Sequence, residues 1–407
     1  MSFPPPTTLD TSNRSRILNL GAGPSSLPTS VLLQSAQDLL DYKGTGIGLC
    51  ELSHRSGTFK QILDSAESDL RSLLSIPEDY AVLFTQGGGT EQFSATALNL
   101  LAYDAARHGR APGTLDYAVT GSWSSKAIKE GERMGGRVKA VTDSKKRDGK
   151  FGRIAPIEEW ELSPASECAM LYYCDNETVD GVEFPSPGLP IHQLPDDYRK
   201  NVPIVADCSS NILSRPIDVA AHSLIFFGAQ KNVGPPGVTI LIARKSLLAR
   251  HPDESIPFGG PRIPTTLVYK NLADNSSLYN TPPMFSIHVS GLVFRHLIEQ
   301  GGVKGAEQRS SEKAQLVYST IDESKGFYEG TTSATSRSRM NVTFRIKGGD
   351  DGLEGKFVEF CKERGIEQVK GHRSVGGIRA SLYNAISVDD AKRLVEAMRE
   401  FCGQHSG

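Results

Sequence analysis

Two neighbouring stretches decide the fold: PIVADCSSN (203–211) and LIFFGAQKNVGPPGVTILIA (224–243). They contain three apolar runs, at 204–206, 224–227 and 238–243. None of these runs alternates with polar residues, a pattern typical of strands buried on both faces of a sheet. An ionisable residue follows each of the first two runs, Asp207 and Lys231 respectively. The stretches therefore predict buried strands with chemically useful side chains at their carboxyl ends.

The same alternation extends outward from these stretches, from about residue 80 to residue 245. Helical patterns, for instance at 91–101 and 124–134, separate the apolar runs. The predicted strands are Ala81–Phe84, Tyr117–Thr120, Val138–Val141, Met170–Cys174, Ile204–Ala206, Leu224–Phe227 and Val238–Ala243. This order predicts an α/β fold in which a mostly parallel seven-stranded sheet is sandwiched by helices.

The pattern changes after about residue 285, where long helical segments (287–299, 305–324) precede a strand (340–346) and a further helix (353–364). The last helix begins after Ser387, a favourable N-cap residue. Its apolar residues share one face: Ala391, Leu394, Val395, Met398, Phe401 and Cys402. We expect a disordered or extended lead-in at 1–16, a large domain at 17–285 and a smaller α+β domain at 286–407.

Composition argues against several classes of protein. The 45 Lys and Arg against 47 Asp and Glu give a formal net charge of −2, without the basic excess that nucleic acids or membrane surfaces require. The sequence contains no run of 18 or more apolar residues, the length that a membrane-spanning helix needs. The six cysteines form no CxxC pair and no metal-ligand spacing, which fits reduced thiols in the cytoplasm. The charged stretch DSKKRDGKFGR (143–153) is interpreted as a solvated loop.

A glycine-rich turn, FTQGGGTEQF (84–93), joins a predicted strand to a predicted helix. Free N–H groups at such a helix start can bind a phosphate, although many turns of this kind are only tight turns. The turn matches neither the P-loop nor the GxGxxG pattern, so a nucleotide-binding protein has no support.

The order of Asp207 and Lys231 along the chain indicates a function that neither residue indicates alone. Alone, an Asp after a strand is usually a cap or turn residue, and a loop lysine is usually exposed. Together they follow successive strands, downstream of a phosphate-site candidate. This order is the arrangement of pyridoxal-phosphate (PLP) enzymes with the aspartate-aminotransferase fold.

Nine motifs carry a resemblance to a known family. They are GAGPSSLP (21–28), HRS (54–56), GGGTEQF (87–93), GSW (121–123), CDNETVDG (174–181), ADCSSNILS (206–214), GAQKNVGPPG (228–237), NTPPMFSIHVSGLVF (280–294) and GHRSVGGIRASLYNA (371–385). In this order the chain resembles the phosphoserine aminotransferases, within the class-V aminotransferases, along nearly its whole length. The resemblance implies that the large domain binds PLP.

The resemblance also implies a role for individual residues at the cofactor. Lys231 would bind PLP as a Schiff base, Asp207 would pair with the pyridine nitrogen, and Trp123 would stack on the ring. Further cofactor contacts would come from Gly89, Thr90, Thr178 and Gln230, and from Asn280 and Thr281 of a partner subunit. The resemblance therefore also implies a homodimer whose two subunits share their active sites.

The substrates implied are L-glutamate and 3-phosphohydroxypyruvate, which become 2-oxoglutarate and O-phospho-L-serine in L-serine biosynthesis. Arg379 would bind the α-carboxylate, because a guanidinium binds carboxylates bidentately. His372 and Arg373 would bind the second anion, with His54 and Arg55 of the other subunit. The sequence departs from the family at Glu91, whose carboxylate would repel a phosphate unless it points away.

Three alternatives stay open. A cysteine desulfurase or a serine–glyoxylate-type aminotransferase shares the fold and the Asp–Lys pair. The first would need a mobile catalytic cysteine loop, and the second does not need the GHRSVGG signature (371–377). A catalytically silent binding protein would not need Lys231, Asp207 and Trp123 together.

Overall fold

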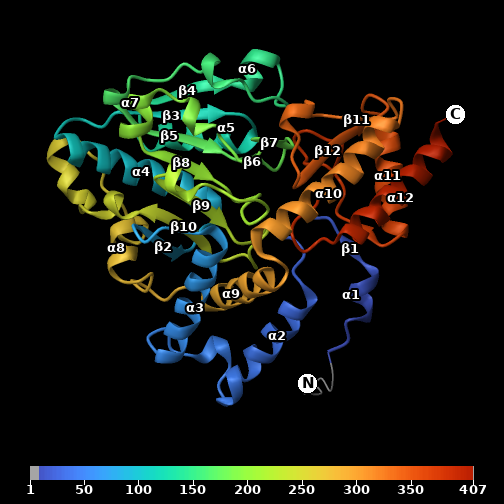
Figure 1. Cartoon of the computed structure of the whole chain (residues 1–407), viewed down its shortest axis with the longest axis horizontal. Coiled ribbons are helices and arrows are strands. Elements are labelled where there is room, and N and C mark those ends of the chain that lie inside the picture. The colour runs from blue at the N-terminus through green and yellow to red at the C-terminus, as the bar shows by residue number, and fades with distance from the viewer. Residues whose placement is uncertain (1–8, 407) are drawn as a thin grey trace.

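The structure, a computed structural model, describes residues 9–406 and is organised around a seven-stranded sheet (Figure 1). Its strands lie in the order β2 (Tyr80–Thr85), β10 (Thr239–Arg244), β9 (Leu224–Gly228), β8 (Ile204–Asp207), β5 (Cys168–Cys174), β3 (Thr114–Val119) and β4 (Val138–Asp143). Strand β10 is antiparallel to both of its neighbours, and every other pairing is parallel. All seven predicted strands are confirmed, with small shifts at their ends.

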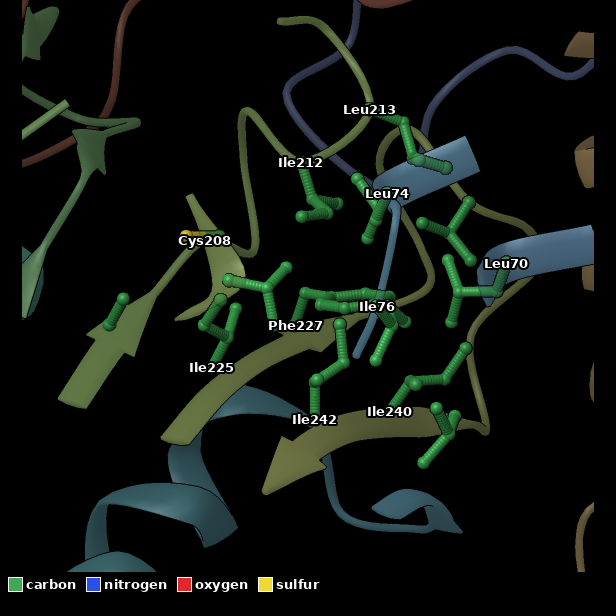
Figure 2. Close-up of a cluster of buried hydrophobic side chains, with 14 of the residues drawn as sticks. Leu70, Leu74, Ile76, Cys208, Ile212, Leu213, Ile225, Phe227, Ile240 and Ile242 are labelled. Atoms are coloured by element: carbon green, nitrogen blue, oxygen red, sulfur yellow. The ribbon is translucent and has the colours of Figure 1, made fainter. Parts of the chain in front are cut away.

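Helices cover both faces of this sheet, which explains why its strands are apolar without alternation. On one face, Ile240 and Ile242 of β10 join a core with α3 (Gly57–Leu74) and α9 (Met284–Glu299); Figure 2 shows both isoleucines in one cluster with Leu70 and Leu74 of α3. Leu241, on the other face, packs in a core with α4 (Gly88–His108), α5 (Ser122–Arg133) and α8 (Tyr269–Asp274). The predicted sandwich is therefore present.

The C-terminal part has its own core and its own sheet. Strands β11 (Tyr328–Gly330), β12 (Asn341–Ile346) and β14 (Ile378–Ser381) form an antiparallel sheet in that order. Helices α10 (Gly302–Glu323), α11 (Asp351–Glu363) and α12 (Val388–His405) pack with it. Ser387 caps α12 by accepting a hydrogen bond from the Asp390 N–H, as the sequence predicts. On this helix Ala391, Leu394, Val395, Met398 and Phe401 are buried, whereas Cys402 is only partly buried.

The two cores divide the chain differently from the sequence-based domains. The core of the large sheet continues past residue 285, through α9 to Ala306 in α10, and the C-terminal core begins at Ala314 of the same helix. Leu18 and Leu20 join the C-terminal core, because β1 (Leu18–Asn19) pairs with β13 (Ile366–Glu367). Within the expected lead-in, residues 1–8 lie outside the described residues, and Ser12–Arg16 form the short helix α1 rather than an extended segment.

Three further α-helices and a small hairpin remain. Helices α2 (Thr29–Leu40), α6 (Ser144–Asp148) and α7 (Asp196–Asn201) lie outside the large sheet, and β6 (Asn176–Glu177) pairs with β7 (Val182–Glu183) in a small hairpin. Over residues 9–406 we find no helix with the length and apolar character needed to cross a bilayer. The six cysteines are all free thiols.

Candidate active site

The site forms where the parallel strands end. Asp207 is the last residue of β8, and Lys231 follows the neighbouring strand β9 by three residues. The segments after β2, β3 and β5 bring Gly89, Trp123 and Thr178 to the same edge. Carboxyl ends of parallel strands meet at one edge of a sheet, so residues far apart in the sequence lie together there.

Lys231 is buried and has few partners for its charge. Its Nζ donates a hydrogen bond to Oγ1 of Thr178 at 2.6 Å and lies 5.7 Å from the centroid of the Trp123 ring. Burial lowers the pKa of Lys231, and the nearby charge of Asp207 opposes this only in part. A neutral, nucleophilic amine is therefore more accessible here than on an exposed lysine.

Asp207 is also buried, and its two oxygens are held differently. Oδ1 accepts the backbone N–H of Ser209 at 2.9 Å, and Oδ2 accepts the hydroxyl of Tyr172 at 3.2 Å. Burial raises the pKa of Asp207, while the hydrogen bonds from Ser209 lower it. The carboxyl group is thus fixed in place beneath the cavity, where it can pair with a cationic ring nitrogen.

A cavity of about 240 Å³ collects most of the predicted site residues. Nine of them line it: Gly89, Thr90, Trp123, Thr178, Asp207, Gln230, Lys231, His372 and Arg379. Ala22 and Gly23 line it as well, because Ser25 holds the N-terminal segment on the lysine loop: its N–H donates a hydrogen bond to the carbonyl oxygen of Gln230 at 2.9 Å, and its hydroxyl donates to that of Lys231 at 2.5 Å. The cavity is therefore built by segments from both ends of the chain.

Arg379 and His372 face this cavity from the C-terminal part. Arg379, on β14, is half-buried and donates to the carbonyl oxygen of Thr178 at 3.4 Å. Burial lowers the pKa of Arg379. Burial also lowers the pKa of His372, and the charge of Arg379 adds to this effect. A bound anion would relieve the repulsion between these two groups, so the pair favours a negatively charged ligand.

Sequence reasoning missed the two acidic residues that hold Trp123. The buried carboxylate of Glu177 accepts the N–H of Trp123 at 2.7 Å and that of Ser124 at 2.9 Å, and Asp180 accepts the N–H of Ser122 at 2.7 Å. Together they cap the first turn of α5, where N–H groups lack helical partners. Burial raises the pKa of Glu177, and the charge of Asp180 raises it further. Both carboxylates belong to the CDNETVDG motif (174–181), but no local pattern indicates which groups they contact.

Five predicted residues lie outside this cavity. Arg373 is exposed beside His372. Asn280 lines a separate cavity, and Thr281 places its hydroxyl 3.3 Å from Nδ1 of His54, next to the exposed Arg55. The four residues assigned to a partner subunit thus gather in one region, apart from Lys231 of their own chain.

Glu91 does not face the cavity that contains Lys231. Its carboxylate folds back over Gly87, where a Cβ atom would lie 1.5 Å from Oε2 of Glu91. Glu91 lines the separate cavity that contains Asn280. The Glu91 carboxylate therefore lies over Gly87 and outside the lining of the cavity that contains Lys231.

Comparison with known proteins identifies the family to which the chain belongs. The family model "Aminotransferase class-V" matches residues 17–394. The phosphoserine aminotransferase of Drosophila melanogaster is 44% identical over 95% of this chain and 98% of its own, and that of Aromatoleum aromaticum is 42% identical over 96% and 99%. The chain belongs to the phosphoserine aminotransferases of the class-V family.

Solved structures of this family agree with the fold. The phosphoserine aminotransferase from Bacillus circulans subsp. alkalophilus aligns with a TM-score of 0.85 at 37% identity, covering 96% of this chain and 99% of its own. The PLP-bound enzyme from Trichomonas vaginalis aligns with a TM-score of 0.82 at 34% identity, covering 94% and 100%. An alanine–glyoxylate aminotransferase from Nostoc shares the fold at 17% identity and a TM-score of 0.71.

Proposed function

We propose that the protein is a PLP-dependent phosphoserine aminotransferase. It transfers the amino group of L-glutamate to 3-phosphohydroxypyruvate and forms O-phospho-L-serine and 2-oxoglutarate, a step of L-serine biosynthesis. The observation that carries the proposal is the buried Lys231 beside Asp207 in a cavity that Arg379 and His372 also line. The full-length similarity to enzymes of that name supports the substrate assignment.

The residues present fit PLP. Gly89 and Thr90 lie in the first turn of α4, whose backbone N–H groups suit a phosphate. A Cβ atom at Gly89 would lie 3.5 Å from Oγ of Ser209 and 3.9 Å from Oδ2 of Asp207, so this turn lies next to the carboxyl group that would pair with the ring. Asp207 would pair with the pyridine nitrogen, Trp123 would stack on the ring, and Thr178 and Gln230 would complete the set. When bound, PLP withdraws electrons from the α-carbon of the substrate.

The chain's own groups then move the proton and orient the substrates. Nζ of Lys231 would accept the proton from the α-carbon of glutamate in the first half-reaction and would donate a proton to the α-carbon of the product in the second, and its lowered pKa favours the first of these steps. Arg379 binds the α-carboxylate with its planar guanidinium. His372 and Arg373 bind the distal anion, which is the side-chain carboxylate of glutamate in one half-reaction and the phosphate in the other.

The proposed enzyme is a homodimer in the cytoplasm, with active sites shared between subunits. The gathering of His54, Arg55, Asn280 and Thr281 away from their own Lys231 supports a role in the partner's site. Exposed apolar side chains occur nearby in the chain, which fits a surface that a second subunit covers. They are Leu33, Leu39, Leu40 and Ile47. The six free thiols suit a reducing compartment.

The reaction is tested with the purified PLP-loaded protein and L-glutamate. We expect 2-oxoglutarate to form with 3-phosphohydroxypyruvate as acceptor, and much less with glyoxylate at the same concentration. A preference for glyoxylate would instead identify the alternative, a glyoxylate-type aminotransferase. Failure of glutamate to change the visible absorbance of the bound cofactor would refute aminotransfer altogether.

Shared sites are tested by mixing two inactive variants, Lys231→Ala and Arg55→Ala. In a mixed dimer with shared sites, one site receives both lesions and the other receives neither. Random exchange makes about half of the dimers mixed, so roughly a quarter of all sites should regain activity. Differently tagged chains confirm the exchange, and each variant is measured alone. Confirmed exchange without recovery would place Arg55 in the site of its own chain.

A further inference from the structure

The hydroxyl group of Tyr172 contacts Asp207 from inside the large sheet. Tyr172 lies in β5, which pairs with β8, the strand that ends at Asp207. Both residues are buried, with 1% and 4% of their surfaces exposed. The hydroxyl donates a hydrogen bond to Oδ2 of Asp207 at 3.2 Å, whereas Oδ1 accepts the N–H of Ser209. Tyr172 does not line the cavity that contains Lys231, so it can act on a bound cofactor only through Asp207.

The ring of Tyr172 is held by three aromatic neighbours. Its centroid lies 5.2 Å from that of Tyr117, 6.2 Å from that of Phe226 and 6.3 Å from that of Phe93. Close packing of this kind holds a side chain in one rotamer, so the hydroxyl stays next to Asp207. Burial also raises the pKa of Tyr172 well above its ordinary value. The hydroxyl therefore keeps its proton and remains a donor.

A hydrogen bond from this hydroxyl stabilises the ionised form of Asp207. Burial raises the pKa of Asp207, and the hydrogen bonds from Ser209 and Tyr172 lower it. Oδ2 also lies close to the cavity wall, because a Cβ atom at Gly89 would be 3.9 Å from it. A pyridine nitrogen that pairs with Asp207 shares one proton with the carboxyl group. A donor on the carboxylate favours the state in which the nitrogen carries that proton.

We propose that Tyr172 is a positioning residue whose hydroxyl keeps Asp207 ionised and thereby holds the shared proton on the ring nitrogen of PLP. The inference rests on the proposed pairing of Asp207 with that nitrogen. A protonated ring withdraws electrons from the substrate α-carbon more strongly than a neutral ring. Tyr172 therefore increases the rate of proton transfer without contacting the substrate.

The test compares Tyr172→Phe, which removes the hydroxyl and keeps the ring, with Tyr117→Phe as a matched control. Tyr117 lies opposite Tyr172 in the pairing of β3 with β5 and is equally buried. Among residues 9–406 its hydroxyl has no hydrogen-bond partner, so its removal changes the same aromatic cluster without changing Asp207.

The protonation of the ring nitrogen is measured directly, without turnover. The wild type and both variants are loaded with PLP that carries ¹⁵N in its ring, and the ¹⁵N chemical shift is followed by solid-state NMR as a function of pH. We expect the nitrogen of Tyr172→Phe to lose its proton about 1 to 2 pH units below that of the wild type, because one hydrogen bond to a charged group is lost. The control should titrate like the wild type.

Steady-state kinetics provide the second measurement. Tyr172→Phe should lower kcat about tenfold, whereas KM for glutamate should stay near that of the wild type, because Tyr172 does not line the cavity. Tyr117→Phe should change neither constant. A larger effect on KM than on kcat in Tyr172→Phe would contradict a role that acts through the ring nitrogen.

The NMR titration distinguishes failure of this inference from failure of the proposed pairing. A ring nitrogen that is unprotonated in the wild type at every pH would refute the pairing with Asp207 itself. A nitrogen that is protonated in the wild type and titrates identically in Tyr172→Phe would leave the pairing intact and overturn the role of Tyr172. An equal shift in both variants would also overturn that role, because packing of the aromatic cluster would then be the cause.

Discussion

Two buried lysines, one in each core region, have opposite surroundings. Lys231 donates one hydrogen bond, to the hydroxyl of Thr178, and otherwise faces the ring of Trp123 and a cavity. Lys313, in α10, is 1% exposed and donates to three carbonyl oxygens at 2.8 Å, those of Leu382, Tyr383 and Ile386. An ammonium group has three donors, so Lys313 is saturated and Lys231 is not.

The difference distinguishes a lysine that stabilises the fold from a lysine that can react. Burial lowers the pKa of both, to about 7 for Lys313. At Lys313 the three carbonyls favour the charged form and tie α10 to the segment before α12. Among residues 9–406 no comparable set of acceptors surrounds Lys231, so the amine is available to react. Partial satisfaction of a buried polar group is costly, and proteins retain it where function requires it.

The largest effect is expected at Lys231. Lys231→Ala should lower kcat by a factor on the order of 10³ or more, because it removes the group that moves the proton. The fold should persist, since the side chain contributes little packing. Activity, the visible absorbance of bound PLP and far-ultraviolet circular dichroism measure the two outcomes. A PLP adduct that borohydride can still fix in this variant would remove Lys231 from its role.

Lys313 should show the reverse pattern. Lys313→Met keeps the side-chain length but leaves three carbonyls without their donor, which should cost about 3 kcal/mol of unfolding free energy. Activity per folded molecule should stay near that of the wild type. Urea unfolding with activity assays below the transition measures both. Lys392→Met is the control, because Lys392 is exposed and its pair with Asp389 lies at the surface. An equal loss of stability in the two variants would contradict the comparison.

The contrast between the lysines also marks what the sequence could predict. Apolar runs identified all seven strands of the large sheet, because strands buried on both faces leave that pattern. Motifs identified nine of the residues that line the cavity. The sequence did not predict the role of Lys313, which lies within a helical pattern, because its three acceptors are about 70 residues away in the chain.

Contacts of this kind require tertiary structure. The Glu177–Trp123 contact spans 54 residues, and no local pattern indicates that a carboxylate will reach the start of α5. Pairing between β1 and β13 likewise joins the two ends of the chain, and Leu18 lies in the C-terminal core for this reason.

Glu177 should affect the environment of Lys231 through Trp123. Glu177→Gln replaces one acceptor oxygen by an NH2 group, which cannot accept the N–H bonds at the start of α5. We expect a roughly tenfold higher Kd for PLP, equivalent to one lost charged hydrogen bond. The chain has two tryptophans, so in a Trp160→Phe background the emission and its quenching by PLP report on Trp123 alone. Unchanged emission, quenching and Kd would show that Glu177 does not position this ring.

The smallest expected effect is a pH dependence of stability that Lys231 contributes to the cofactor-free protein. In the unfolded chain lysine titrates near 10.5, and burial lowers the pKa of Lys231 in the folded state. Between these two pKa values the unfolded state binds more protons, so the wild type gains stability as pH rises. Lys231→Met removes the cost of burying the charge. The variant should therefore be more stable than the wild type at neutral pH.

This gap should narrow as pH rises toward the unfolded pKa, because the wild-type lysine then loses its proton in both states. Urea unfolding of the two cofactor-free proteins at about pH 7 and about pH 9 measures it. Lys313→Met provides the contrast, since it should be less stable than the wild type at both pH values. A Lys231→Met variant that is also destabilised at neutral pH would mean that the folded protein satisfies Lys231 as fully as Lys313, and the distinction between the two lysines would fail.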